Sequence, residues 1–129
     1  MNNSLRAALL AATLLVVHTA AHAETAEDVC DRIAAHPHDR DKPASVKGTS
    51  HVTKKDMDTG IAACSSAAAS PSAHRRFTFQ LGRLHDFDGS HDDAAARYRI
   101  AANAGSTSAM VGLAMLHING AGVRESKDE

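Results

Sequence analysis

Apolar and small side chains recur every three or four residues in five separate stretches of the chain. That spacing places them on one face of an α-helix, whereas a half-buried strand would alternate them every second residue. Turn residues separate the stretches, as at Pro71 and at Asp88 to Ser90. The pattern therefore predicts an all-α protein with helices over 25–36, 56–69, 72–87, 92–103 and 106–118.

The expected helix ends carry residues that suit them. Ser, Thr and Asp side chains can accept a hydrogen bond from the free N–H groups of a first turn, and Gly readily follows a last turn. The candidate caps are Thr25, Asp56 or Asp58, Ser72, and Ser106 or Ser108, with Gly105 placed to end the fourth helix. On the third helix, spacing puts Phe77, Gln80, Leu81 and Leu84 inward and leaves His74, Arg75, Arg76 and Arg83 to solvent.

Residues 37–55 show neither the spacing of an α-helix nor the alternation of a β-strand. This stretch is rich in charge, Pro, Gly and His, which is typical of a surface loop. Loops of this length in a compact domain are usually functional or mobile. We favour a flexible insertion fastened at both ends.

Residues 1–23 resemble an export signal. A short polar start with Arg6 precedes an apolar run over 7–17, and Ala21-His22-Ala23 offers small residues around a cleavage point. The run is too short to span a bilayer. We therefore expect a soluble, periplasmic or secreted mature chain that begins at Glu24 and is not inserted into a membrane.

Two cysteines, Cys30 and Cys64, remain after that cleavage. In an oxidising export compartment an isolated even pair indicates a disulfide, whereas in the cytosol the same pair would be free thiols. The chain has no Cys-x-x-Cys motif that would favour a redox site.

Net charge limits the class of partner, and the content of aromatic residues limits how the core can pack. Without residues 1–23, 13 Lys and Arg face 15 Asp and Glu, a net charge of −2, which argues against a nucleic-acid partner. One Tyr, three Phe and no Trp leave a core that must form by close approach of helices.

A short pattern of Leu, a small residue and His occurs twice in the sequence. Leu81, Gly82 and His85 are followed 32 residues later by Leu113, Ala114 and His117. A unit of two short helices cannot bury its apolar face alone, so such units stack and usually form a binding surface.

These residues resemble known helical repeats. Leu81-Gly82, His85, Gly89, Ala94, Tyr98 and Ala101 are similar to a tetratricopeptide helix pair, and Gly60, Cys64 and Ala67 stand one period of 34 residues earlier. Ala109, Leu113 and the run from Asn119 to Val123 resemble the start of a Sel1-like repeat. Two departures are Ala114, where Gly is usual, and the histidines 85 and 117, where aromatics are usual.

The resemblance implies a short right-handed α-solenoid of stacked antiparallel helix pairs. Its domain plan is a signal peptide over 1–23, a first helix and long loop over 24–55, and repeats over 56–129. Only six residues follow Val123, so the last repeat is incomplete and its helix unpaired. Either the chain is a truncated member of the family, the favoured interpretation, or another chain associates through this helix. The structural positions it implies are Leu81, Gly82, Ala94, Tyr98, Ala101, Leu113, Gly120 and Gly122.

Some secreted Sel1-like proteins are described as β-lactamase-like, but the chain lacks the motifs of that chemistry. It holds no Ser-x-x-Lys, Lys-Thr-Gly, His-Glu-x-x-His or Gly-x-Ser-x-Gly. The mature chain has seven histidines, several beside Asp, which could hold a metal if they converged. Exposed turn residues are the favoured interpretation, and we expect neither a metal nor a cofactor.

The leading hypothesis is a non-enzymatic, Sel1-like interaction scaffold of the bacterial cell envelope that binds a protein or peptide on its concave side. The alternative is a small cell-envelope hydrolase or a His-dependent metal-binding protein on the same scaffold. The candidate partner-binding residues are Arg76, Gln80, Arg83 and Met110, because Arg and Gln can pair with a peptide backbone or carboxylate.

Overall fold

The computed structural model describes residues 22–122, and in that range the chain forms five α-helices and no strand. The expected all-helical fold is confirmed. The expected signal peptide and the residues from Val123 onward lie outside the described range, apart from positions 22 and 23. The helices are α1 (Ala26–Ala34), α2 (Lys54–Ala68), α3 (Arg75–Phe87), α4 (His91–Asn103) and α5 (Thr107–Ile118).

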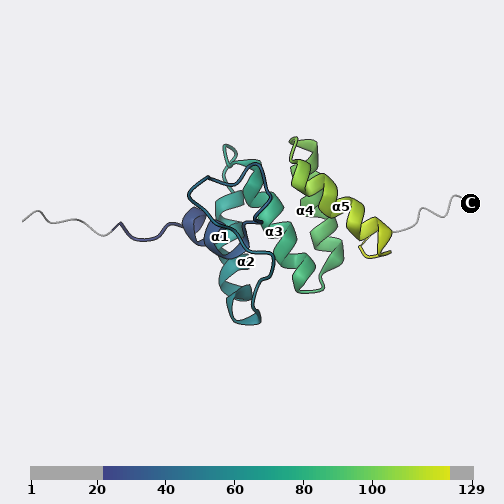
Figure 1. Ribbon diagram of the computed structural model, residues 1–129, viewed down its shortest axis with the longest axis horizontal. Coiled ribbons are helices and arrows are strands. Elements are labelled where there is room, and N and C mark those ends of the chain that lie inside the picture. Colours follow the sequence, from purple (N-terminus) through teal and green to yellow (C-terminus); the bar gives the residue numbers. More distant parts are fainter. Residues whose placement is uncertain (1–21, 123–129) are drawn as a thin grey trace, which may run out of the picture.

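Each helix packs against the next in sequence, and α3 also contacts both α1 and α5. Figure 1 shows the result as a row that runs from α1 and α2 at one end to α5 at the other. None of the helices in residues 22–122 combines the length and apolarity needed to cross a bilayer.

Local chemistry explains most helix ends. The Thr25 hydroxyl accepts from the Asp28 N–H at 3.1 Å while Asp28 accepts from the Thr25 N–H at 3.0 Å, a capping box that fixes the start of α1. The Ser106 hydroxyl likewise accepts from the Ala109 N–H at the start of α5. Thus Thr25 caps α1 as expected, and Ser106 rather than Ser108 caps α5.

Two helix starts differ from the sequence expectation. α2 begins at Lys54, after Thr53, whose hydroxyl donates to Asp56 at 2.6 Å. α3 begins only at Arg75, with His74 as its cap. Ser72, the expected cap, instead has its hydroxyl 3.0 Å from that of Ser70 in the preceding turn.

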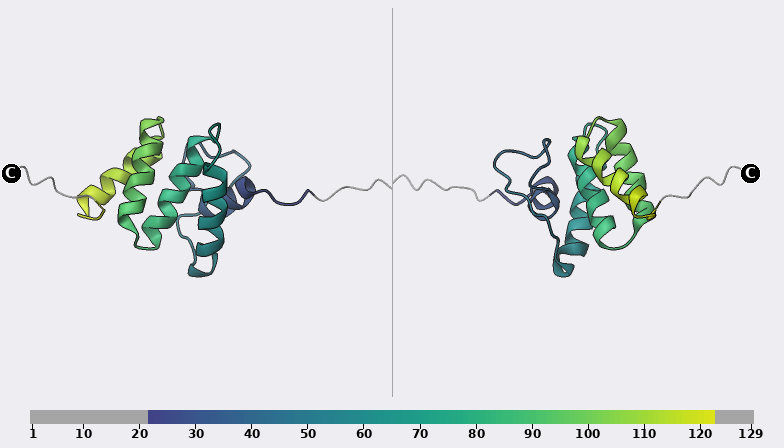
Figure 2. Two further views of the ribbon diagram at one scale, coloured as in Figure 1. Left: turned by 180° about the vertical axis from the view of Figure 1, so that it is seen from behind. Right: turned by 45° about the vertical axis from the view of Figure 1, so that its right-hand side comes forward.

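Two apolar clusters meet at α3. The first joins α1 and α2 to Phe77, Leu81 and Leu84 of α3. The second joins Phe79 of α3 to buried residues of α4 and α5. Because α3 contributes residues to both clusters, it is the wall shared by the two halves. Figure 2 shows the same row of helices from two further sides.

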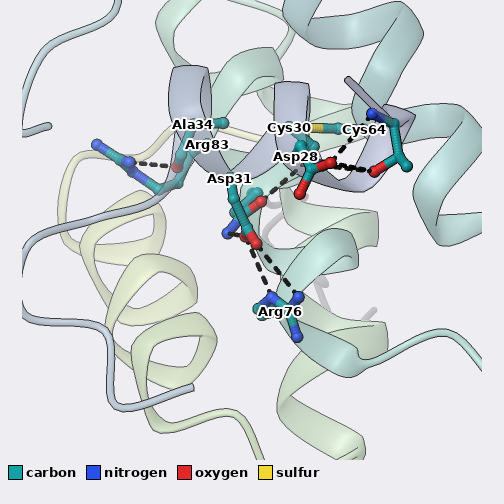
Figure 3. Close-up of a disulfide and its surroundings, with 9 residues drawn as sticks. Asp28, Cys30, Asp31, Ala34, Cys64, Arg76 and Arg83 are labelled. Atoms are coloured by element: carbon teal, nitrogen blue, oxygen red, sulfur yellow. Dashed lines mark hydrogen bonds and ion pairs between the residues drawn. A yellow bond between two sulfur atoms is a disulfide. The ribbon is translucent and has the colours of Figure 1, made fainter. Parts of the chain in front are cut away.

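A disulfide joins α1 to α2. Cys30 and Cys64 are bonded and both fully buried, which confirms the pairing expected from the sequence. Figure 3 shows the bond beside Asp31, the next residue of α1.

The long connection between α1 and α2 is fastened along its length rather than only at its ends. We call residues 36–53 the strap. Its base is closed by a hydrogen bond from the Thr49 N–H to the Ala35 carbonyl at 2.8 Å. There Gly48, with φ of 77°, lies so close to the backbone of residues 36 and 37 that a Cβ would be 2.8 Å from the Pro37 nitrogen. The flexible insertion predicted from composition is therefore a segment held by specific contacts.

Candidate functional site

An apolar groove lies between α3 and α5 and is closed on one side by the strap. Its volume is about 300 Å³. Residues of α3 and α5 spaced three or four apart turn toward it because that spacing returns to one helix face. We call it the α3–α5 groove; its lining is His36, His38, Phe79, Arg83, Asp86, Tyr98, Ser108, Val111, Gly112 and Met115.

Tyr98 of α4 forms the floor of the groove. Its ring lies between Gly82 of α3 and Gly112 of α5: a Cβ at Gly82 would be 2.7 Å from ring atom Cδ1, and one at Gly112 would be 2.9 Å from Cε2 and Cζ. The Phe79 ring lies beside it, with centroids 5.9 Å apart. Any side chain at either glycine would collide with the ring, so three helices converge on this one residue.

The Tyr98 hydroxyl is linked through Asp86 to His91. It donates to Asp86 Oδ2 at 3.4 Å, and Asp86 Oδ1 lies 3.2 Å from His91 Nδ1. Burial, followed by the negative charge of Asp86, raises the pKa of Tyr98 well above its ordinary value. The residue therefore stays neutral and acts as a hydrogen-bond donor rather than as a base.

Arg83 brings a buried positive charge to the wall of the groove. Only 5% of the residue is exposed. Its Nη1 donates to the Ala34 carbonyl and its Nη2 to that of Thr49 at 2.9 Å, so it joins α3 to the last residue of α1 and to the strap. Burial lowers the pKa of Arg83, while the charges of Asp39 and Asp86 act in the opposite direction. No ion pair within 4.0 Å includes Arg83 among residues 22–122.

Asp39 and Asp41 attach the strap to the C-terminal helices. Asp39, 5% exposed, accepts from the Ser108 hydroxyl at 2.8 Å through Oδ1, while its buried Oδ2 has no hydrogen-bond partner in the described residues. Asp41 accepts two hydrogen bonds from Arg75, at 2.6 and 2.8 Å. Arg75 also donates to the Ala104 carbonyl just after α4. The strap is thus held by α3 and by α5, and Arg75 links it to the end of α4.

His36 borders the groove and carries a shifted pKa. Burial, then the positive charge of Arg83, lowers the pKa of His36 below its ordinary value, while Asp39 acts in the opposite direction. The His38 ring lies 5.6 Å away, between centroids. His36 is therefore neutral under conditions in which an exposed histidine begins to take up a proton.

Three of the four predicted partner-binding residues are engaged within the chain. Arg76 pairs with Asp31 at 3.1 Å (Figure 3). Gln80, which is fully buried, donates to the same carboxylate at 2.8 Å. Gln80 Oε1 also lies 2.8 Å from Cys30 Sγ, a contact without a proton because the sulfur is in a disulfide. Only Arg83 borders the groove, whereas Met110 is 48% exposed and does not line it.

The expectation that Arg83 faces solvent was wrong. The strap folds back over α3 and covers this side chain, which spacing along the helix cannot reveal.

The positions implied by repeat resemblance lie mainly in the two cores. Leu81 and Gly82 are buried on α3, and Leu113 is half-buried on α5. Ala94 and Ala101 are buried beside Tyr98 on α4. Gly120 and Gly122 have positive φ after α5, and Gly122 lies against the backbone of His91. Gly112 is the position that the repeat pattern missed.

Residues 22–122 contain no group of three or more His, Cys, Asp or Glu side chains able to hold a metal ion. Comparison with protein-family models, with curated proteins and with solved structures finds no match to this chain.

Proposed function

We propose that this chain is a non-catalytic interaction module of the bacterial cell envelope that binds a segment of a partner protein in the α3–α5 groove. The proposal includes a tetratricopeptide and Sel1-like arrangement, a short right-handed α-solenoid made of antiparallel helix pairs. Export by residues 1–23 into an oxidising compartment belongs to the same proposal.

The packing order supports the repeat arrangement. Helices that follow one another are in contact, and α3 also contacts the helices two places away on either side. In a solenoid the first helices of successive units line one face together. Tyr98 between Gly82 and Gly112 is the close crossing of large and small residues that such stacking requires.

The buried disulfide supports export. A structural disulfide is stable in the periplasm or outside the cell and rare in the cytosol. Cys30 and Cys64 are bonded at the centre of the N-terminal core, which fits a protein that folds after export.

The groove itself is the observation that carries the proposal. Phe79 and Tyr98 form an apolar floor, and Val111 and Met115 of α5 present partly exposed apolar side chains at its edge. Asp86 and Arg83 add polar groups at the wall. Such a lining fits an apolar side chain of a partner together with the backbone polar groups beside it.

Site-specific photo-crosslinking tests this directly. A photoreactive residue replaces Val111, which is 63% exposed at the groove, in the full chain expressed with its own N-terminus. The matched control carries it at Ala62, an exposed position on α2. We expect a discrete protein adduct from position 111 and none from position 62, with the crosslinked peptide of the partner identified by mass spectrometry.

A second variant asks whether the groove is the binding surface. Met115→Glu places a charge at the groove from a side chain that is 50% exposed, so the helices remain folded, as circular dichroism would verify. We expect the position 111 adduct to disappear. An adduct unaffected by Met115→Glu, or equal labelling at positions 62 and 111, would overturn the proposal.

A further inference from the structure

Two side chains of opposite charge line the α3–α5 groove from the same helix. Arg83 and Asp86 both border it, and residues three apart on a helix have Cβ atoms about 5 to 6 Å apart. Arg83 is 5% exposed, whereas the Asp86 side chain is 38% exposed. One wall of the groove therefore carries a positive and a negative group within one helical turn, beside the aromatic floor.

Arg83 keeps hydrogen-bond donors that the protein does not use. A guanidinium has five N–H groups, and this one gives one hydrogen bond to the Ala34 carbonyl and one to the Thr49 carbonyl. No carboxylate in residues 22–122 lies within 4.0 Å of it. Buried charges in proteins are normally paired. A carboxylate of a bound molecule would supply the missing ion pair.

Asp86 keeps acceptor capacity in the same way. A carboxylate offers about four lone-pair positions. Oδ2 accepts from the Tyr98 hydroxyl at 3.4 Å, and Oδ1 lies 3.2 Å from His91 Nδ1. The remaining positions can accept from N–H groups of a molecule in the groove.

We propose that the α3–α5 groove binds a free α-amino acid whose apolar side chain is about the size of leucine. Its carboxylate accepts from Arg83, its ammonium group donates to Asp86, and its side chain packs on the aromatic floor. The inference shares the groove with the proposed function and goes beyond it, because it requires no partner protein.

The pair of opposite charges selects a ligand that carries both. A simple anion at Arg83 would lie close to the carboxylate of Asp86, and a simple cation at Asp86 would lie close to Arg83. A zwitterion places each of its charges beside the opposite one and brings no net charge. In an α-amino acid both groups are bonded to one carbon, which suits two charges one helical turn apart.

The size and the apolar lining fit the same ligand. A volume of about 300 Å³ is at the small end of the range for ligand sites, about 300 to 1,000 Å³. Phe79 and Tyr98 are 4% and 3% exposed and form a fixed floor, whereas Val111 and Met115 at the edge are 63% and 50% exposed. A small apolar side chain between floor and edge would remove apolar surface from water.

Titration of the full chain, expressed with its own N-terminus, with L-leucine tests the proposal by NMR of the backbone amides near neutral pH. Two analogues each lack one charge: N-acetyl-L-leucine has no ammonium group, and L-leucinamide has no carboxylate. We expect leucine to shift the signals of the groove residues. Each analogue should bind at least about tenfold more weakly, because a hydrogen bond to a charged group is worth about that factor.

A variant at Asp86 tests the ammonium contact. Asp86→Asn keeps an oxygen that can accept from the Tyr98 hydroxyl but removes the negative charge, and circular dichroism would verify that the helices remain. We expect leucine to bind at least about tenfold more weakly, while N-acetyl-L-leucine binds no more weakly than before. Asp88→Asn, at an exposed position outside the groove lining, is the matched control and should leave leucine binding unchanged.

The carboxylate contact is followed in the unchanged protein, because replacing Arg83 would also remove its hydrogen bonds to Ala34 and to the strap. The side-chain N–H signals of Arg83 should move on addition of L-leucine or N-acetyl-L-leucine. L-Leucinamide, which has no carboxylate, should leave them in place.

Equal affinity for leucine and its two analogues would overturn the proposal, because the groove would then recognise apolar surface alone. So would the absence of shifts at millimolar leucine, shifts confined to residues outside the groove, or unchanged leucine binding by Asp86→Asn. The crosslink from position 111 reports a partner protein instead. An adduct without leucine binding removes this inference and leaves the proposed function standing, and leucine binding without an adduct does the reverse.

Discussion

The two halves of the molecule are held together by different chemistry. On the N-terminal side of α3, a disulfide and hydrogen-bonded charged groups fix α1 and the strap, with Asp31 bound to both Arg76 and Gln80. On the C-terminal side, α4 and α5 pack through alanines and one Tyr98 ring between two glycines. Directional hydrogen bonds close the first half, while close contact builds the second and leaves the groove open and Val111 and Met115 of α5 partly exposed.

This contrast bears on which residues of the proposed partner-binding surface are available. A side chain that is already bonded inside the protein must lose those bonds before it can bind a partner. Arg76 and Gln80 are in that position. Val111 and Met115 are partly exposed apolar side chains that gain contacts without losing any. Partner binding in the C-terminal half therefore requires less rearrangement.

Removal of the disulfide should produce the largest effect and confine it to the N-terminal half. The bond joins residues 34 apart, and a loop of that size stabilises by about 3 to 4 kcal/mol in the chain-entropy model. We expect Cys30→Ala with Cys64→Ala to lower the free energy of unfolding by that amount in urea titrations. Ser65→Ala, at an exposed position on α2, is the control and should change it by less than about 0.5 kcal/mol.

Amide hydrogen exchange shows where the loss falls. In the double variant, exchange should accelerate more in α1 and α2 than in α4 and α5, because only the first pair loses its link. A loss below about 1 kcal/mol would mean that the Asp31 hydrogen bonds alone hold α1 in place. Equal acceleration in all helices would mean that the two halves unfold as one unit, which contradicts a loss confined to the N-terminal half.

Gly112→Ala should have the next largest effect, in the C-terminal half. In an open helix this change stabilises by about 0.5 to 1 kcal/mol. Here the new methyl group would meet the Tyr98 ring at 2.9 Å, and Gly82 on the far side prevents the ring from moving away. We expect the free energy of unfolding to fall by about 1 to 3 kcal/mol, measured in urea.

A double-mutant cycle isolates the contact. Tyr98→Leu retains much of the apolar volume but removes the flat ring. Gly112→Ala should therefore lower the free energy of unfolding less in the Tyr98→Leu background than with Tyr98 present. Equal costs in the two backgrounds, or a stabilising Gly112→Ala with Tyr98 in place, would show that the ring is not held between the glycines.

The sequence alone predicted the features that depend on residues close together in the chain, such as helix positions and helix caps. Thr25 and Ser106 were recognisable caps, and helical spacing located all five helices. Two chemical cues, an isolated pair of cysteines and an export-like start, were enough to predict the Cys30–Cys64 bond. Ser72 was misleading because its hydroxyl interacts with Ser70 in the turn, while α3 begins three residues later.

Contacts between distant segments were not predictable. Arg83 donates to the carbonyls of Ala34 and Thr49, which lie 49 and 34 positions away in the sequence. No local pattern encodes such contacts. The groove was missed for the same reason. Gly112 did leave a signal, because a glycine in the middle of a helix is unfavourable and often marks a close approach, but the repeat pattern drew attention to Ala114 instead.

The smallest effect we expect is a pH dependence where the two halves meet, at His36. Burial holds the pKa of His36 below its ordinary value of about 6.5, with Arg83 and His38 adding to the shift and Asp39 opposing it. Above that pH both folded and unfolded chains are neutral at this residue. As the pH falls, the unfolded chain takes up the proton first, so stability falls until the folded pKa is passed. Urea titrations from pH 7.5 to 5, a range chosen to span about that value, should show this loss, and His36→Asn should reduce it. NMR titration of the His36 ring should give a midpoint below that of the unfolded chain; a midpoint at or above it would mean that the strap does not hold His36 against Arg83.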